Sequence, residues 1–314
     1  TVHEVRLPSR AVPAERRIVR DLLRELAPDV AHCHGYRPEI LHGTSARGLG
    51  IPTVSTEHGS SKLGGTTAFF EWLQTRLFRR ASAVVAVSTP IRDRLVEEAG
   101  VPADLVHVIP NGWAGGTDFL DRSAARDALG LDADGPVVGF VGRLIPAKGP
   151  DVFVEAMLEL DRPDVTAVVI GDGADRDALQ ARAQEAGRAS RFLFTGSVNP
   201  AAPLLRAFDV FVLSSRTEGT PIVLLEAMAA GVPTVVTTVG GVPDVVSDAE
   251  ALLVPAENPR ALASAIDAAL ADPTGASSRA AAAGRRLSDD FAASRWLDRH
   301  ERLYRHVSRR ERRR

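Results

Sequence analysis

Short apolar runs alternate with longer segments of mixed polarity along the whole chain. The run 209–213 (Asp-Val-Phe-Val-Leu) is an example of the short apolar segments, because it is rich in β-branched and aromatic residues. Runs of this kind are typical of strands buried on both faces of a parallel sheet. We predict strands at 28–32, 51–56, 82–88, 105–109, 136–142, 165–171, 192–197, 209–214, 233–238 and 251–254. Between them we predict helices near 14–26, 36–48, 66–80, 90–99, 150–160, 174–187, 201–207, 221–231 and 258–271.

A segment rich in Gly, Pro and Asn at 110–117 interrupts this alternation and predicts a hinge. The fold class is therefore α/β, with two doubly wound, Rossmann-like parallel-sheet domains that face each other across a cleft. We place the first domain at 1–112, the second at 113–290, and a last helix with a basic tail at 291–314. Ligands of such sheets bind at the carboxyl ends of the strands.

Two carboxylates, Glu218 and Glu226, lie on either side of a predicted strand-to-helix turn. Thr220 is suited to cap the helix and Pro221 to begin it. The backbone amides from Gly219 onward would then form an anion-binding helix N-terminus. Because carboxylates repel phosphate, the two glutamates more plausibly hold neutral hydroxyls. Sugar hydroxyls on either side of a diphosphate fit this arrangement.

The strand at 136–142 ends at Gly142 and continues directly into Arg143 and, five residues later, Lys148. The glycine spacing fits neither a dinucleotide fingerprint nor a Walker A loop. Lys148 and Lys62 are the only lysines among 38 basic residues, which makes them candidates for positions where a compact point charge is needed, with chance as the alternative, above all for Lys62. Arg143 and Lys148 could both bind a diphosphate, although two solvated cations on a surface loop remain the alternative.

Other polar groups follow the strand ends. The turns at 171–173 and 195–198, the latter ending at Val198, offer backbone groups suited to a nucleobase. His58 follows a strand and precedes a Gly-rich loop, which makes it a candidate for the cleft. His32 and His34 form a His-x-His pair. No set of cysteines or carboxylates completes a metal site around it, so we predict no metal.

Composition excludes several other classes. A net charge of −2 gives no case for nucleic-acid binding, and 45% hydrophobic with 25% charged residues is typical of a globular protein. A single cysteine, Cys33, fits a reducing compartment, so we predict a cytoplasmic protein. The tail at 308–314 is basic. It is either a solvated helix end or a weak peripheral contact with anionic lipid at the inner membrane face.

Taken in order, these motifs resemble the GT4 glycosyltransferases, which are retaining, nucleotide-sugar-dependent enzymes of the GT-B fold. The resemblance covers nearly the whole chain, and its most specific part is the Glu-x7-Glu motif together with the Gly-Arg-Leu-x3-Lys-Gly loop. The segments that carry it are 29–35, 57–59, 109–112, 141–149, 171–173 and 218–226.

The resemblance implies a role for each residue. Arg143 and Lys148 would neutralise the donor diphosphate, and Glu226 would bind the ribose hydroxyls. Glu218 would bind the transferred sugar, and His58 would contact that sugar from the opposite, acceptor-side domain. GT-B enzymes generally need no metal and no cofactor beyond the nucleotide-sugar co-substrate. The last helix of the family commonly crosses back to the first domain, and 291–307 is the candidate for this.

The family begins with a strand and a Gly-rich loop that have no counterpart here, so we expect this chain to start near the third strand of its first domain. The leading hypothesis is transfer of a hexose to a hydroxyl of a lipid, glycan or small molecule. Two alternatives are a truncated protein that binds nucleotide sugar without transfer, and a nucleotide-sugar 2-epimerase of the same architecture. The sequence does not identify the sugar, the base, the acceptor or the oligomeric state.

Overall fold

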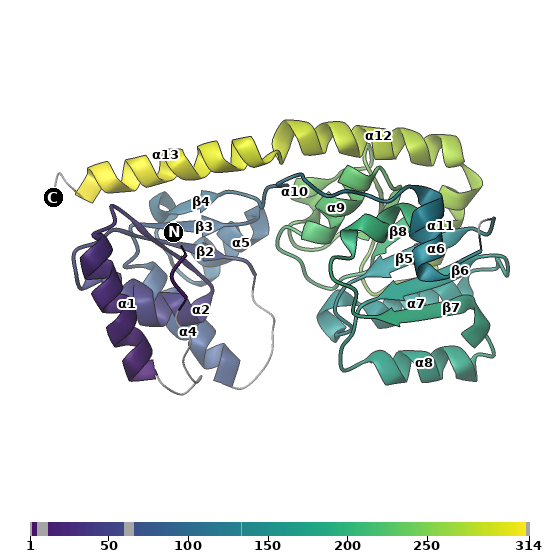
Figure 1. Ribbon diagram of the computed structural model, residues 1–314, viewed down its shortest axis with the longest axis horizontal. Coiled ribbons are helices and arrows are strands. Elements are labelled where there is room, and N and C mark those ends of the chain that lie inside the picture. Colours follow the sequence, from purple (N-terminus) through teal and green to yellow (C-terminus); the bar gives the residue numbers. More distant parts are fainter. Residues whose placement is uncertain (1, 5–11, 60–65, 133, 312–314) are drawn as a thin grey trace. The chain divides into compact units, whose positions relative to one another are not determined.

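The computed structural model describes residues 2–4, 12–59, 66–132 and 134–311, and its chain forms two compact units (Figure 1). The first unit comprises Thr1–Pro110 and Trp296–Arg314, and the second comprises Asn111–Arg295. The chain therefore leaves the first unit at the start of the predicted hinge and returns to it within the predicted last helix. Lys62, singled out above, lies outside the described residues.

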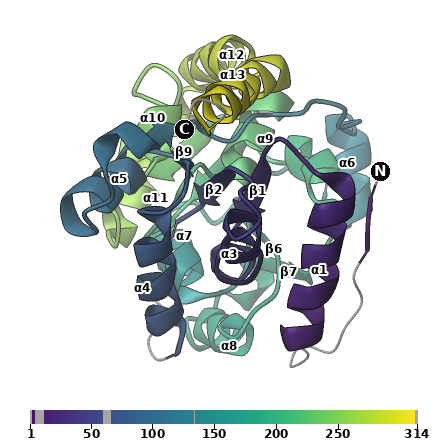
Figure 2. The same cartoon turned by 90° about the vertical axis from the view of Figure 1, so that its left-hand side faces the viewer.

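The first unit contains a four-stranded parallel sheet in consecutive order. Its first two strands are labelled in Figure 2. Its strands are β1 (Ala31–His34), β2 (Thr53–Glu57), β3 (Ala83–Ala86) and β4 (Val106–Val108). Every residue of β2 and β3 is buried, which explains why these strands are continuous runs without polar alternation. Residues 2–4 form no strand.

Helices cover this sheet, and the last helix of the chain is one of them. α13 (Ala293–Glu311) packs Leu303 and Val307 against Val54 and Val85 of the sheet, whereas α4 and α5 contribute to a second apolar cluster. The other helices of the unit are α1 (Val12–Leu26), α2 (Tyr36–Pro38), η1 (Glu39–Gly43), α3 (Thr44–Arg47), α4 (Thr66–Phe78), α5 (Thr89–Asp93), η2 (Arg94–Glu98) and η3 (Ala103–Leu105).

The helix predicted at 36–48 is interrupted by the wide π turn of η1. Glu39 in this turn is fully buried, and its carboxylate accepts hydrogen bonds from Ser55 and, at 2.8 Å, from Arg47. The spacing of apolar residues along the chain gives no sign of a helix turn whose buried side chain is a carboxylate. The sequence pattern therefore predicted one regular helix here.

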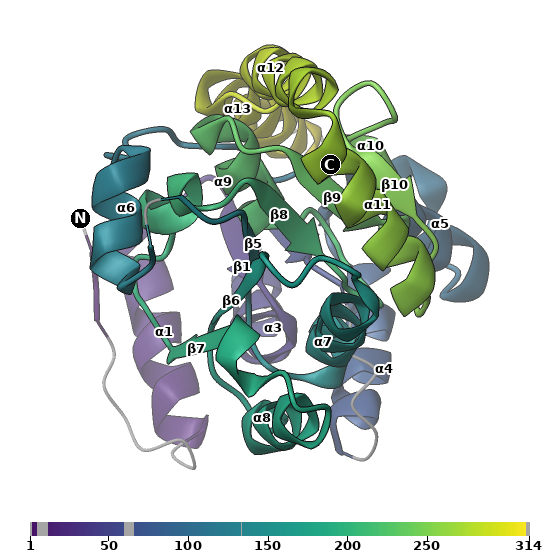
Figure 3. The same ribbon diagram turned by 90° about the vertical axis from the view of Figure 1, so that its right-hand side faces the viewer.

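The second unit contains six parallel strands in the order β10-β9-β8-β5-β6-β7 (Figure 3). This is the doubly wound order, in which the direction of strand addition reverses between the neighbouring strands β5 and β8. The prediction of two parallel-sheet α/β domains is confirmed. The strands are β5 (Val137–Val141), β6 (Thr166–Ile170), β7 (Phe192–Gly196), β8 (Val210–Leu213), β9 (Thr234–Thr237) and β10 (Leu252–Val254).

Apolar clusters cover both faces of this sheet. One cluster includes side chains of α6, η6, α9, α10 and α12, and the other includes those of α7, α8 and α11. The prediction had omitted α6 and α12, whose sequences are dominated by Ala and Arg and carry few large apolar residues. The elements are α6 (Arg122–Leu129), η4 (Pro146–Lys148), α7 (Pro150–Glu159), α8 (Arg176–Glu185), η5 (Ala189–Arg191), η6 (Ala202–Ala207), α9 (Ile222–Ala230), α10 (Val242–Val245), α11 (Pro259–Ala271) and α12 (Pro273–Asp290).

None of the helices in the described part of the chain is long and apolar enough to cross a membrane. The basic tail is described only as far as the end of α13, because 312–314 lie outside the described residues. Contact of this tail with lipid stays a prediction.

Gly139, in the centre of β5, tests the packing of the second unit. A Cβ atom there would lie 2.2 Å from the ring of Phe208, which is itself 3% exposed. We expect Gly139→Ala to lower the free energy of unfolding by about 1–3 kcal/mol through overpacking. The measurement is urea unfolding followed by circular dichroism.

Gly284→Ala in α12 is the matched control, because its new Cβ would meet nothing closer than 3.8 Å. We expect it to be neutral, or stabilising by up to about 1 kcal/mol, since alanine favours the helix. A Gly139→Ala protein as stable as the control would contradict this packing.

Candidate functional site

The loops that follow β5 and β8 meet where the strand order reverses. Gly149, at the end of the first loop, has a φ of +61°, and a Cβ atom there would lie 2.0 Å from the carbonyl oxygen of Ser214. The Ser214 hydroxyl donates to the Gly149 carbonyl at 2.7 Å. Only glycine allows this approach, and the approach brings the Lys148 loop against the Glu218 loop.

Lys148 and Glu218 form an ion pair between these loops. The Lys148 Nζ atom lies 2.7 and 2.8 Å from the two carboxylate oxygens, and the Ser215 hydroxyl donates to Oε1 at 2.6 Å. The Glu218 side chain is 5% exposed, whereas that of Lys148 is 27% exposed. The carboxylate is therefore held inside, and the ammonium still faces solvent on one side.

A glycine turn supports Glu218 from behind. The Gly241 amide donates to the Glu218 carbonyl at 3.1 Å, and a Cβ atom on Gly240 would lie 2.0 Å from the same oxygen. The sequence pattern did not single out this turn. Its Gly-Gly pair, placed directly after the β9 segment, was the signal that could have indicated it.

Arg216 is a second residue that the sequence did not single out. Its guanidinium binds both carboxylate oxygens of Asp151 at 2.8 and 2.6 Å, Glu257 at 2.8 Å and the Pro146 carbonyl at 2.7 Å. It thereby connects the Glu218 loop with the Lys148 loop and the start of α7. The hydrogen bond from Arg216 holds the pKa of Asp151 below its usual value.

Arg143 and Gly142 occupy the start of the β5 loop. Arg143 is exposed and has no ion-pair partner within the described residues. The Gly142 amide donates a hydrogen bond to the Ile170 carbonyl at 3.0 Å. A Cβ atom on Gly171 would lie only 1.8 Å from the Gly142 carbonyl oxygen. The backbone at this strand end is therefore fixed, while the Arg143 side chain is exposed.

The helix start near Gly219 differs from the prediction by one residue. α9 begins at Ile222, Pro221 is its N-cap residue and no side chain caps it. The Thr220 hydroxyl instead accepts a hydrogen bond from the Asn111 amide at 3.3 Å, so the prediction that it caps α9 was wrong. The first amides of α9 are not occupied by a side-chain cap.

Glu226 lies slightly more than one turn into α9. It is half-buried, and no hydrogen-bond partner is found for its carboxylate among the described residues. Burial raises its pKa above the usual value. A half-buried carboxylate of this kind is suited to accept hydrogen bonds from hydroxyl groups of a ligand.

Val198 follows β7 and is half-buried against the apolar cluster that contains Ile170 and Leu213. The structure thus places it beside a neighbouring strand end of the same sheet. The nucleobase contact expected of this segment stays a prediction.

His58 belongs to the first unit and follows β2. Its Nε2 atom lies 3.0 Å from Nδ1 of His34, and the two rings are stacked with centroids 5.3 Å apart. Burial by its neighbours lowers the pKa of His58, and His34 lowers it further. Among the described residues, no group of three or more histidine, cysteine or carboxylate side chains is arranged to hold a metal ion.

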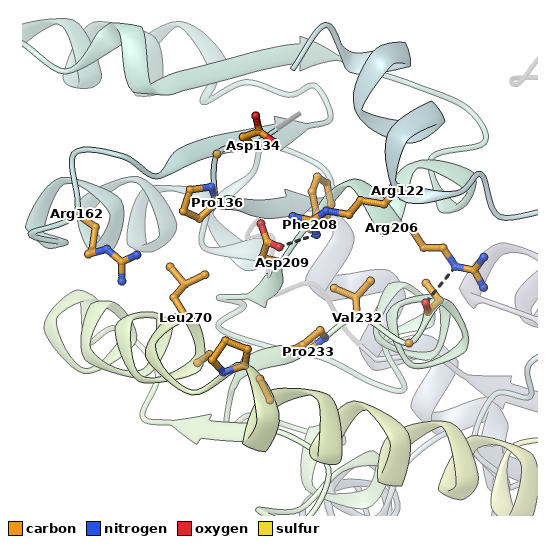
Figure 4. A pocket seen from close by; sticks show the side chains of 16 residues that line it. Arg122, Asp134, Pro136, Arg162, Arg206, Phe208, Asp209, Val232, Pro233 and Leu270 are labelled. Atoms are coloured by element: carbon orange, nitrogen blue, oxygen red, sulfur yellow. Dashed lines mark hydrogen bonds and ion pairs between the residues drawn. The ribbon is translucent and has the colours of Figure 1, made fainter. Parts of the chain in front are cut away.

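A cavity of about 510 Å³ lies at the opposite edge of the second sheet, before the strands begin (Figure 4). Asp209 there pairs with Arg122 at 2.6 Å and with Arg126 at 2.9 Å, and accepts a hydrogen bond from the Val137 amide. The carboxylate of Asp209 is therefore already bound by other residues of the second unit. Parallel α/β sheets bind ligands at the other edge.

Comparison with known proteins decides the family. The model described as "Glycosyl transferases group 1" matches residues 121–287, and that described as "Glycosyltransferase Family 4" matches residues 2–113. The chain belongs to the family 4 glycosyltransferases. It is an enzyme of this kind, with two parallel-sheet domains of the GT-B type.

Curated relatives agree with this assignment. The glycosyltransferase is 35% identical over 296 residues to a D-inositol 3-phosphate glycosyltransferase of Xylanimonas cellulosilytica, covering 86% of this chain and 71% of the relative. It is 31% identical over 278 residues to an alpha-D-kanosaminyltransferase of Streptomyces kanamyceticus, covering 80% and 70%.

Solved structures show the same fold. Anabaena Alr3699/HepE in complex with UDP and glucose has a TM-score of 0.84 at 23% identity, covering 94% of the glycosyltransferase and 83% of that chain. Sucrose-phosphate synthase from Thermosynechococcus elongatus has a TM-score of 0.81 at 24% identity, covering 96% and 80%.

Arg216→Gln tests the connection between the two loops. Because its hydrogen bonds lower the pKa of Asp151 in the folded state, the stabilisation is present above the ordinary value of 3.8 and is lost as pH falls through the folded pKa. We expect the variant to lose about 1 kcal/mol of unfolding free energy at pH 7. The difference in unfolding free energy between the wild type and the variant should become smaller as the pH falls below about 4.

Urea unfolding at several pH values measures this difference. Arg285→Gln, an exposed change on α12, is the control and should be neutral throughout. A deficit of Arg216→Gln that widens on acidification would contradict the assignment.

Proposed function

We propose that this enzyme is a retaining glycosyltransferase that moves a hexose from a UDP-sugar to a hydroxyl group of an acceptor. The observation that carries the proposal is the arrangement at the switch between β5 and β8. There the ion-paired ammonium of Lys148, the guanidinium of Arg143 and the half-buried carboxylate of Glu226 follow neighbouring strands, and the latter two have no partner among the described residues. Complexes of the structural neighbour HepE with UDP and with UDP-glucose support a uridine nucleotide.

Each residue then has a defined task. Arg143 and Lys148 bind the diphosphate, and Glu226 accepts hydrogen bonds from the ribose hydroxyls. Lys148 can keep contact with Glu218 while a further N–H bonds to a phosphate oxygen, because an ammonium has three donors. Glu218 accepts hydrogen bonds from the transferred sugar. For His58 we keep the role that the family implies, which is contact with that sugar.

The chemistry requires charge stabilisation on the leaving group. The bond between the anomeric carbon and the phosphate oxygen breaks, and its electron pair leaves with UDP. The acceptor oxygen attacks from the same face, and its proton passes to the leaving phosphate oxygen. Arg143 and Lys148 stabilise the negative charge that develops on UDP, as a metal ion would do elsewhere. We therefore propose that transfer needs no metal.

The direct test is mass spectrometry of products from a panel of UDP-, GDP- and ADP-sugars with candidate hydroxyl acceptors, together with proton NMR to identify the anomeric configuration and any epimer. Release of UDP together with a glycosylated acceptor of retained configuration supports the proposal. Binding of UDP-sugar without turnover would show that this chain only binds the donor. Formation of the 2-epimer of the sugar would show epimerase chemistry instead. Turnover that is abolished by a chelator would contradict metal independence.

Glu226→Gln tests the ribose assignment. Loss of a hydrogen bond from a hydroxyl to a charged acceptor costs about 1.5 kcal/mol, so we expect UDP to bind about 10-fold more weakly in isothermal titration calorimetry. Glu185→Gln on α8 is exposed and should bind UDP as the wild type does. Equal affinities of Glu226→Gln and wild type would contradict the assignment.

Arg143→Ala tests the leaving-group role. This variant is cleaner than Lys148→Ala, because removal of Lys148 would leave the buried Glu218 carboxylate without its ion pair. We expect kcat for UDP release to fall about 10²–10³-fold. Arg285→Ala is the exposed control. If Arg143→Ala turned over at the wild-type rate, the leaving-group model would fail.

A further inference from the structure

Five aromatic rings form a continuous row in the first unit, from the end of β2 to α13. His58 stacks on His34 with centroids 5.3 Å apart, and His34 stacks on His32 at 4.3 Å. His32 faces His300 at 5.8 Å, and His300 contacts Trp296 at 4.1 Å. Because β1 and β2 are paired in parallel, their carboxyl ends bring the first three of these rings together.

His32 is the fixed member of the row. Its Nδ1 atom lies 2.6 Å from the Tyr304 hydroxyl, and its Nε2 atom lies 2.7 Å from the Thr56 hydroxyl. Both ring nitrogens are therefore occupied, and the ring cannot rotate without losing a hydrogen bond. Burial lowers the pKa of His32 to about 3, so it stays neutral. His32 thus gives the His34 ring a rigid surface to stack on.

His34 and His58 are connected by one hydrogen bond, in which a single proton lies between His34 Nδ1 and His58 Nε2. If the proton is on His34, then His58 must carry its own proton on Nδ1. If the proton is on His58 Nε2, its Nδ1 atom is a bare acceptor. In both cases the two neutral rings have the same tautomer, so the hydrogen bond couples the tautomer of His58 to that of His34. The free nitrogen of His58 is a donor toward a ligand in the first case and an acceptor in the second.

We propose that His34 is a positioning residue that fixes the orientation and the tautomer of His58. The proposal rests on the proposed function only in that His58 faces substrate. His34 itself needs no contact with substrate. It acts because its ring is stacked against the anchored His32 on one side and hydrogen-bonded to His58 on the other.

Neighbouring groups favour the neutral form of the pair. His32 on β1 and His300 on α13 are the titratable groups that face it, and Tyr304 and Thr56 are used by His32. The nearby carboxylate of Glu57 is engaged by Arg94 at 3.3 Å and by the Gly59 amide at 3.2 Å. Burial is the main cause that lowers the pKa of both His34 and His58.

Nitrogen-15 NMR of the histidine rings in the full chain tests the proposal without any substrate. Long-range proton–nitrogen spectra give the tautomer and the pKa of each ring, and His58→Gln assigns the His58 signals. In the wild type, His34 and His58 should show the same single tautomer. In His34→Ala, His58 should populate both tautomers and its pKa should shift upward, because the burial that the His34 ring provides is lost.

Two further variants distinguish positioning from simple packing. The amide of Asn in His34→Asn can occupy the place of Nδ1, so we expect it to restore a single His58 tautomer. His107→Asn on β4 is the control, since it removes another histidine of the same unit that has no part in the row. Unchanged His58 tautomer and pKa in a folded His34→Ala protein would overturn the proposal.

Turnover provides a second, separate measurement. With a donor that the wild type uses, His34→Ala should lower kcat about 10-fold to 100-fold through misplacement of His58, and His34→Asn should recover part of it. In His34→Ala, the acidic limb of the plot of kcat against pH should shift to higher pH. If no donor is turned over by the wild type, the proposed function fails, while the NMR result still decides the role of His34. Wild-type kcat in His34→Ala would also overturn the proposal.

Discussion

The ion pair between Lys148 and Glu218 is the interaction on which the candidate site depends. A carboxylate that is 5% exposed is stable only when it is paired and hydrogen-bonded, so the two loops must hold Lys148 and Ser215 at bonding distance. This explains the glycines around it. Gly149 lets one loop approach the other, and Gly240 lets the next turn support Glu218 from behind.

The same constraint connects the fold to the chemistry. The strand order reverses between β5 and β8, and at such a point the carboxyl ends of the two neighbouring strands are not crossed by helices. The two loops of the site start from these two strands. Arg216 connects the two loops through Asp151 and the Pro146 carbonyl. Arg143 and the Glu226 carboxylate have no ion-pair or hydrogen-bond partner among the residues that the structure describes.

Much of this fold could be predicted from the sequence, because buried parallel strands consist of continuous β-branched runs that are visible at any position. Helices α6 and α12 were not predicted, since they are rich in alanine and arginine and contain few large apolar residues. The turn around Glu39 was missed because a buried carboxylate interrupts the pattern. Within the candidate site, Arg143, Lys148 and Glu218 follow strand ends and Glu226 lies in the helix after one of them, so the sequence pattern singled these residues out. Arg216 was not, because its partners lie 65 and 41 residues away in the chain.

In the first unit, prediction from the sequence is limited in the same way by contacts between residues far apart in the chain. The His-x-His pair was visible in the sequence, but its meaning depends on Tyr304, which is 272 residues away from His32 and reaches it through α13. No local pattern predicts such a contact.

The most direct test of the account is a crystal structure of this chain with UDP bound. We predict the diphosphate within hydrogen-bond distance of Lys148 Nζ and the Arg143 guanidinium, with the ribose hydroxyls on Glu226. UDP bound away from the carboxyl ends of β5 and β8, with the Lys148–Glu218 pair facing no phosphate, would contradict it.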